Sequence, residues 1–315
     1  MSLRDVLERW QAPIYLVTVV LAAVFAWQFD GMQVLEVAIN PALALMLYVT
    51  FLQVPWTELR AVWVQGRFLL ALLVTNFVAI PLLVGALSLM LPSDDLLRFG
   101  VLLVLLAPCI DYVVTFAHMG KADARLLLAC TPVLLVVQML LLPFYIEVML
   151  GSQAADWVQL GAFVDAFIWL IVAPLALAVA TQWWAQRSST GQRWSAVLAL
   201  LPVPATAMVL FVVMAAVVPQ LGAAPDAVRQ VLPVYVAFAV LAPAAAWCVA
   251  QLFKLPAPAA RAVAFSGSTR NSLVVLPLAL AVPGAMPVLP AVIVAQTLVE
   301  LLSELVYIQL MPKLR

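Results

Sequence analysis

Two short polar runs interrupt apolar stretches of the sequence, and each contains residues that can bind a solute. The first run carries a thiol and a carboxylate, Cys109 and Asp111, directly after Pro108. The second carries a guanidinium and an amide, Arg270 and Asn271, within a series of serines and threonines. A thiolate is a soft ligand that suits thiophilic ions, whereas a guanidinium suits anions. These two runs are therefore the first candidates for a binding site.

A third group of polar residues, close to the C-terminus, has the spacing of a proton-carrying stripe. Gln296, Glu300 and Glu304 lie four residues apart, so they share one face of a helix. Two ionised carboxylates on that face would repel each other, and we expect at least one to hold a proton. Glu300 is the leading coupling candidate because it lies deeper in the apolar stretch. Glu304 could instead reach the cytoplasmic interface.

The stretches that hold these residues have the composition of membrane-spanning helices. Hydrophobic residues make up 67% of the 315-residue chain and charged residues 10%, which excludes an ordinary soluble domain. The apolar runs are continuous rather than alternating, which favours helices over a β-barrel. Ten spans, most of about 20 residues or more, are predicted: 13–29, 34–54, 68–91, 97–118, 124–150, 158–184, 194–218, 229–253, 259–282 and 287–311.

Lys and Arg residues are distributed unevenly between the loops. With the N-terminus placed in the cytoplasm, twelve fall in inner segments and two, Arg98 and Arg229, in outer loops. Positively charged loops stay in the cytoplasm, so both termini are predicted to be cytoplasmic. We interpret residues 13–29 as a retained span, with a cleaved signal peptide as the competing interpretation. The net charge of zero gives no indication of nucleic-acid binding.

The two halves of the chain share an order of residues at offsets of 158 to 163 positions. Arg67 and Pro81 are fourteen residues apart, and Arg229 and Pro243 repeat that spacing in the second half. Each half holds five spans, an odd number, so the second half enters the membrane from the opposite side. Inverted repeats of this kind are typical of secondary transporters.

Corresponding spans of the two halves are predicted to be interrupted. The fourth contains Pro108, which removes a helical N–H, and the ninth contains Gly267, which we expect to loosen the helix. In inverted-repeat transporters such broken helices form the substrate site near the middle of the membrane. We expect the two breaks to cross, so that the buried charges of Asp111 and Arg270 compensate each other.

The segment Ala107-Pro-Cys-Ile-Asp111 resembles the bile acid/sodium symporter superfamily, and in particular its arsenite-efflux and arsenic-resistance branch, which has a cysteine at this break. The resemblance extends from about the second span to the tenth. It implies that interrupted spans four and nine cross at the substrate site. One departure concerns sodium: relatives that use it have an acidic residue in the broken part of span nine, where this chain has Ser268-Thr-Arg-Asn-Ser272.

The sequence therefore predicts one all-α membrane domain of ten helices, built as two inverted five-helix repeats, 1–155 and 156–315. We interpret it as a secondary transporter rather than an enzyme, in a bacterial-type inner membrane. The favoured function is efflux of arsenite or a related metalloid by alternating access, and proton exchange is implied by the resemblance. The alternative is a sodium- or proton-coupled carrier of small organic anions. A membrane sensor or scaffold that transports nothing is a third interpretation.

The candidate residues fall into two sets, and no cofactor or resident metal is expected beside a proton or sodium as coupling ion. The substrate set is Cys109, Asp111, Thr115, Arg270, Asn271 and Ser272. The coupling set is Glu300, Asp111, Gln138 and Gln296. Structural interpretations compete with both sets: the thiol as a small packing residue, the Asp–Arg pair as a structural ion pair, and the glutamines as hydrogen-bonding groups between helices. The oligomeric state is left open.

Overall fold

The computed structural model describes residues 6–7, 10–29, 31–53, 65–110, 112–151, 161, 168–221, 224–282 and 284–314. These residues are helical almost throughout, and their one extended pairing is an isolated antiparallel bridge between Pro108 and Arg270. The predicted all-α class is thus confirmed for the described part of the chain. The chain divides into two compact units, and each takes segments from both halves of the sequence: Met1–Pro55 with Leu160–Pro219, and Trp56–Gln159 with Gln220–Arg315.

The first unit contains none of the predicted site residues. Its elements are α2 (Gln11–Gln28), η1 (Met32–Leu35), α3 (Glu36–Phe51), η3 (Ile168–Val172), α12 (Ala173–Ala185), α13 (Ser189–Leu198) and nearly all of α14 (Pro202–Leu221). Polar side chains join α3 to α12: Tyr48 shares a hydrogen bond of 2.9 Å with Thr181, and Gln182 donates to the carbonyl of Leu52 at 2.9 Å.

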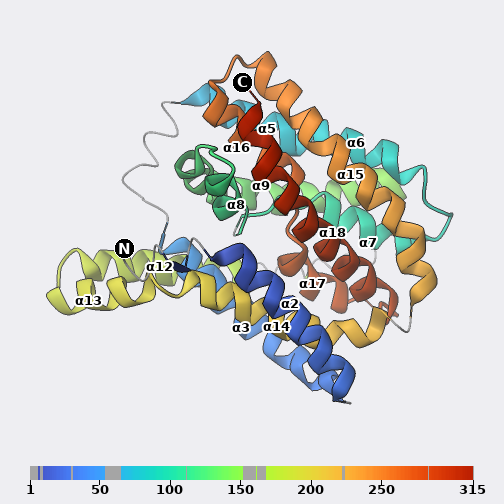
Figure 1. Cartoon of the computed structure of the whole chain (residues 1–315), viewed down its shortest axis with the longest axis horizontal. Helices are drawn as coiled ribbons and strands as arrows, with labels where there is room; N and C mark the ends of the chain where they lie inside the picture. The colour runs from blue at the N-terminus through green and yellow to red at the C-terminus, as the bar shows by residue number, and fades with distance from the viewer. Residues whose placement is uncertain are drawn as a thin grey trace. The chain divides into compact units, whose positions relative to one another are not determined.

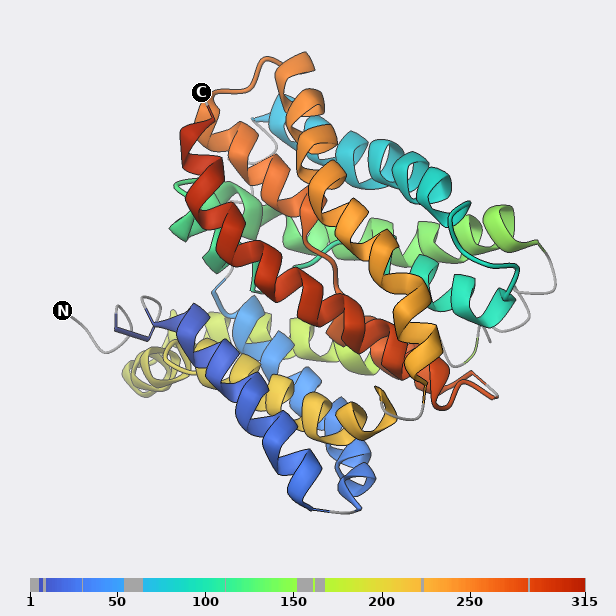
Figure 2. The same cartoon turned by 45° about the vertical axis from the view of Figure 1, so that its right-hand side comes forward.

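The second unit holds every predicted site residue that the structure describes. Its elements are α5 (Gly66–Val74), η2 (Thr75–Ala79), α6 (Ile80–Ser88), α7 (Asp95–Leu105), α8 (Val113–Met119), α9 (Ala124–Leu150), α15 (Pro225–Leu252), α16 (Ala257–Ser268), α17 (Ser272–Leu280), α18 (Val288–Leu310) and η4 (Met311–Lys313). Figures 1 and 2 show α18, in dark red, running beside α15 and α7, with which it packs.

The predicted ten-span count is only partly supported by helix length. Among the described residues, four helices are long and apolar enough to cross a membrane: Gly66–Ser88, Ala124–Leu150, Pro225–Leu252 and Val288–Lys313. A fifth candidate is the pair α13 and α14, which bends by 46°. The multi-span character therefore stands, while the count of ten and the five-plus-five repeat stay predictions.

Both predicted interruptions are present. Helix α7 ends at Leu105 and α8 begins at Val113, so the chain is non-helical on both sides of Pro108. Helix α16 ends at Ser268, and Thr269 adopts an extended conformation (φ −107°, ψ 132°) before α17 begins at Ser272. A missing N–H and three consecutive polar residues mark the two breaks, in agreement with the sequence.

The role predicted for Gly267 was wrong. Helix α16 runs through Gly267 instead of breaking there. A Cβ atom at this position would lie 2.6 Å from Cβ of Ala246 in α15 and 2.9 Å from Cγ2 of Thr75 in η2. The glycine is therefore needed for close packing of α16 against two neighbouring elements, and not for a loose backbone.

Replacing Gly267 by alanine is expected to lower the free energy of unfolding by about 1–3 kcal/mol, because the added methyl group overpacks this contact. Thermal unfolding of the purified protein in detergent measures the change. Gly66→Ala is the matched control, since a Cβ there meets nothing within 4 Å. Equal stability of the two variants would contradict the close approach of α16 to α15.

Prolines in the two halves free backbone carbonyls that tyrosines then bind. Pro81 has no N–H to donate to the carbonyl of Phe77, and the hydroxyl of Tyr145 donates to that carbonyl at 2.5 Å. In the second half, the hydroxyl of Tyr307 donates to the carbonyl of Ala239, four residues before another proline. In both halves, a tyrosine hydroxyl thus donates to the carbonyl four residues before a proline, at positions related by the predicted repeat. The repeat boundary near residue 155 stays a prediction.

Candidate functional site

The two interruptions meet through their backbones. The N–H of Cys109 donates to the carbonyl of Thr269 at 3.1 Å, and the N–H of Asn271 donates to the carbonyl of Ala107 at 2.7 Å. These bonds make the short antiparallel bridge around Pro108 and Arg270. Non-helical backbone at membrane depth must find such partners within the protein. The crossing expected from the sequence is therefore present, with polar side chains directly beside it.

Arg270 is completely buried, and its guanidinium binds oxygen atoms of the protein itself. Nη2 donates to the carbonyl of Ser266 at 2.6 Å and to Oδ1 of Asn76 at 3.0 Å, and Nη1 donates to the carbonyl of Leu105 at 3.3 Å. The two carbonyls lie in the last turns of α16 and α7, where the helix dipole is negative. The ring of Phe238 adds a cation–π contact at 5.5 Å.

The predicted partner of Arg270 was Asp111, which lies outside the described residues. Among the residues that the structure describes, Arg270 makes no ion pair with a carboxylate. The dipoles of two helix ends and an amide stabilise its charge instead. The Asp111–Arg270 pair accordingly stays a prediction.

Asn76 reaches the crossing from a π-helical turn, η2, inserted between α5 and α6. Such turns are rare, and they occur often at functional sites. Besides accepting from Arg270, the Asn76 side chain donates to the Ser266 hydroxyl at 3.0 Å and to the carbonyl of Leu72 at 3.1 Å. One amide therefore links the third span to the broken ninth span and fixes the guanidinium.

Glu300 approaches the crossing from α18. Its Oε2 accepts from the backbone N–H of Arg270 and from Nε2 of Gln296, both at 2.6 Å, and its Oε1 accepts from the hydroxyl of Tyr112. The same hydroxyl lies 3.3 Å from the carbonyl of Arg270. The carboxylate therefore joins α18 to both breaks of the crossing, while the coupling role of Glu300 and Gln296 stays a prediction.

Glu304 lies one helical turn further along α18 and is also completely buried. Its Oε1 accepts from the hydroxyl of Thr269 within the ninth-span break. Its Oε2 has no hydrogen-bond partner among the described residues. The alternative that Glu304 reaches the aqueous interface was therefore wrong, because packing of α18 against the break places this carboxylate in the interior.

Besides Arg270, three of the predicted substrate residues lie at the crossing with buried side chains: Cys109, Asn271 and Ser272. The Ser272 hydroxyl accepts from Thr297 of α18 at 2.8 Å. Neither polar atom of the Asn271 amide has a hydrogen-bond partner within the described part of the chain. A buried amide with open bonding capacity, in the same crossing as a buried cysteine, is the feature that most resembles a binding site.

Two other predicted residues lie apart from this cluster. Thr115 is half-buried in α8, and its N–H donates to the carbonyl of Tyr112 at 3.0 Å, but the side-chain hydrogen bonds given above for the described residues of the crossing do not include it. Gln138 is buried in α9, and neither atom of its amide has a partner among the described residues. The two glutamines of the coupling set therefore differ, because Gln296 donates to Glu300 and Gln138 makes no such bond among the described residues.

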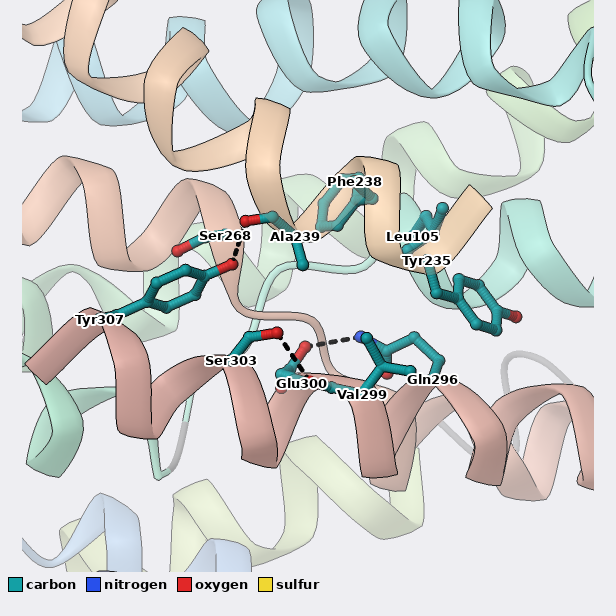
Figure 3. A pocket seen from close by; sticks show the side chains of 10 residues that line it. All are labelled: Leu105, Tyr235, Phe238, Ala239, Ser268, Gln296, Val299, Glu300, Ser303 and Tyr307. Carbon is teal, nitrogen blue, oxygen red and sulfur yellow. Dashed lines mark hydrogen bonds between the residues drawn. The ribbon is translucent and has the colours of Figure 1, made fainter. Parts of the chain in front are cut away.

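A pocket with an empty volume of about 220 Å³ adjoins the carboxylates. Figure 3 shows Glu300 and Gln296 joined by a hydrogen bond at its floor, with Phe238 and Tyr235 on α15 opposite and Tyr307 at one end. Aromatic rings and a buried carboxylate thus share one small cavity. Glu300 is therefore one of the residues that line this cavity.

Several residues that build the cluster were not predicted as site residues. Tyr112 and Thr269 bind the two carboxylates, Ser266 supplies a carbonyl to Arg270, and Thr297 binds Ser272. Tyr112 and Thr269 directly adjoin predicted residues inside the two breaks, so their sequence position was an available signal. Thr297 directly follows the predicted Gln296, but its contact with Ser272, 25 residues away in the chain, has no signal in the sequence.

Comparison with known proteins identifies the family. No curated protein matches the chain. The sequence profile of the Sodium Bile acid symporter family matches residues 40–224, more than half of the chain. The match includes the fourth-span break and ends before the ninth-span break and α18, so it does not cover Arg270 or Glu300. With its long apolar helices, the chain is an integral, multi-pass membrane protein that belongs to the sodium bile acid symporter family, whose members are transporters.

Proposed function

We propose that this protein is a secondary active transporter that exports arsenite or a related metalloid in exchange for protons. The observation that carries the proposal is the crossing of the two breaks, to which Cys109 and the open amide of Asn271 both belong. Arsenous acid is uncharged and carries three hydroxyl groups on a thiophilic centre. A thiol can contact its arsenic, and an amide can both donate to and accept from its hydroxyls. A single thiol also permits release, which transport requires.

Proton exchange is supported by the two carboxylates of α18. Glu300 and Glu304 lie one turn apart, both are buried, and each binds a group within the ninth-span break. Ionisable residues at membrane depth are frequent elements of proton relays. A proton that binds to or leaves one of them changes a contact to the break directly, which links coupling to the substrate position.

The alternative, a carrier of small organic anions, needs a cation that faces its substrate. Arg270 was the residue considered for that role. Its guanidinium contacts Leu105, Ser266 and Asn76, so an anion would have to displace interactions within the protein. An uncharged solute avoids this competition, and the metalloid is therefore our preferred substrate.

Everted membrane vesicles test the proposal. Vesicles that contain the protein are expected to accumulate arsenite when their interior is acidic, because protons leave as arsenite enters. Vesicles without the protein are the control. Failure to accumulate arsenite with or without a proton gradient would refute the assigned substrate.

The Cys109→Ser variant is expected to weaken arsenite transport by at least about tenfold in apparent affinity, equal to about 1.4 kcal/mol, because a hydroxyl is a poor ligand for arsenic. Cys130→Ser is the control for burying a hydroxyl, since Cys130 is equally buried in α9. Cys248→Ser is the exposed control. Concentration dependence of uptake measures the effect. If Cys109→Ser and Cys130→Ser transport equally well, the thiol at the crossing has no part in recognition.

A further inference from the structure

The oxygen atoms around the Arg270 guanidinium form the kind of set that binds a monovalent cation. They are two main-chain carbonyls, of Leu105 and Ser266, and the amide oxygen of Asn76. Both carbonyls belong to the C-terminal turns of half-helices that end at a break. In broken-helix transporters such helix ends and unwound carbonyls coordinate the coupling cation. Three separate elements, α7, α16 and η2, therefore converge on one positive charge.

The carboxylates near the Arg270 guanidinium do not contact it, which agrees with a cation that is stabilised by dipoles. Among the described residues, the carboxylates that face the crossing are Glu300 and Glu304, both from α18. Glu300 contacts the backbone N–H of Arg270, and Glu304 contacts the hydroxyl of Thr269. Neither forms an ion pair with the guanidinium. The cationic group is thus set among oxygen dipoles, with negative charge nearby but not in direct contact.

We propose that the Arg270 guanidinium is a tethered substitute for a bound alkali cation. The side chain reaches from the ninth-span break into a set of oxygens that would otherwise take a sodium ion, and it holds α7, α16 and η2 together permanently. The protein then needs no sodium at this position. The inference adds to the proposed secondary transport, but it concerns the coupling cation and does not depend on the identity of the substrate.

Shortening the side chain opens the site, and cation binding can then be measured directly. The variants are Arg270→Ser, which removes the guanidinium and leaves space, and Arg270→Met, which removes the charge and fills the space. Arg229→Ser is the control for losing an exposed arginine, since the Arg229 side chain is 81% exposed. Thermal unfolding of each purified protein is recorded in sodium chloride, in N-methylglucamine chloride and with added methylguanidinium, at equal ionic strength.

Arg270→Ser is expected to unfold about 2–4 °C higher in sodium than in N-methylglucamine, because an ion that binds only the folded state stabilises it. Methylguanidinium is expected to give a similar shift. The native protein, Arg270→Met and Arg229→Ser are expected to show none. Should Arg270→Ser be unstable, the fraction recovered as a single species from membranes solubilised in each salt replaces the melting curve.

Two results would overturn the inference. One is a sodium-specific rise in the unfolding temperature of the native protein, since its site would then accept sodium beside Arg270. The other is the same stability, or the same poor recovery, of Arg270→Ser in all three cations. Loss of arsenite transport in the vesicle assay would refute the proposed substrate and leave these cation measurements unaffected, so the two failures are distinguishable.

Discussion

Replacing Arg270 by methionine is expected to lower the free energy of unfolding by about 3–5 kcal/mol, because three buried acceptors lose their donor at about 1–3 kcal/mol each. Methionine fills much of the space but donates no hydrogen bond. The carbonyls of Leu105 and Ser266 and the amide oxygen of Asn76 then lose their donor in the interior, and unsatisfied buried acceptors are strongly unfavourable. Because these oxygens belong to three elements, the loss affects the whole crossing.

Thermal unfolding in detergent measures this effect, and a decrease in the midpoint of roughly 10 °C corresponds to it. Arg229→Met is the matched control. Arg229 is exposed and lies 3.6 Å from the exposed carboxylate of Asp226, so its replacement is expected to change the free energy of unfolding by less than about 0.5 kcal/mol. Native-like stability of Arg270→Met would show that the guanidinium does not hold the three elements together.

Replacing Glu304 by glutamine is expected to abolish proton-driven accumulation of arsenite while the protein still folds. Glu304 is preferred to Glu300 as the carrier here, because its Oε2 is open to a proton among the described residues, whereas both oxygens of Glu300 already accept hydrogen bonds. The amide oxygen of glutamine can accept from Thr269 as the carboxylate does, but an amide neither binds nor releases a proton near neutral pH. Without a membrane potential, one proton exchanged per arsenous acid across one pH unit sustains at most about a tenfold gradient. The variant is expected to reach only equal concentrations on the two sides.

Two further measurements make this result specific. Exchange of labelled arsenite across the vesicle membrane without a proton gradient is expected to continue in Glu304→Gln, which separates lost coupling from lost binding. Glu147→Gln is the control for an exposed glutamate on α9 and is expected to behave as the native protein. Accumulation by Glu304→Gln equal to that of the native protein would exclude Glu304 as the proton carrier. The same assay on Glu300→Gln then tests the other carboxylate.

Replacing Glu300 by glutamine is expected to have a different effect from replacing Glu304, because the two carboxylates have different hydrogen-bond partners. Oε2 of Glu300 accepts from two N–H groups, of Arg270 and Gln296. A glutamine side chain can place either its NH₂ group or its oxygen at this position. If the NH₂ group lies there, no hydrogen bond forms, because all the groups are donors. Only the opposite orientation of the amide keeps these contacts, and it then faces the Tyr112 hydroxyl with the NH₂ group. We therefore expect Glu300→Gln to affect both the stability of the crossing and coupling, in contrast to Glu304→Gln.

Much of the fold followed from local features of the sequence. Continuous apolar runs predicted helices, and α9 begins and ends where the apolar run 124–150 does. Pro108 marked the first break because a proline cannot supply the N–H that a helix needs. The second break lies within the polar run 268–272, as expected, whereas Gly267 belongs to α16 and serves close packing instead of loosening the helix.

The sequence by itself determined that this chain is a multi-span, all-helical membrane protein with two interrupted helices and a few charges at depth, because hydropathy, proline and charge act over a few neighbouring residues. Only the tertiary structure decided what those charges contact. Arg270 binds Asn76 from 194 residues away and Glu300 binds Tyr112 from 188 residues away. Such partners depend on how the helices pack, and a π-helical turn that directs Asn76 toward the crossing has no signature in composition or periodicity.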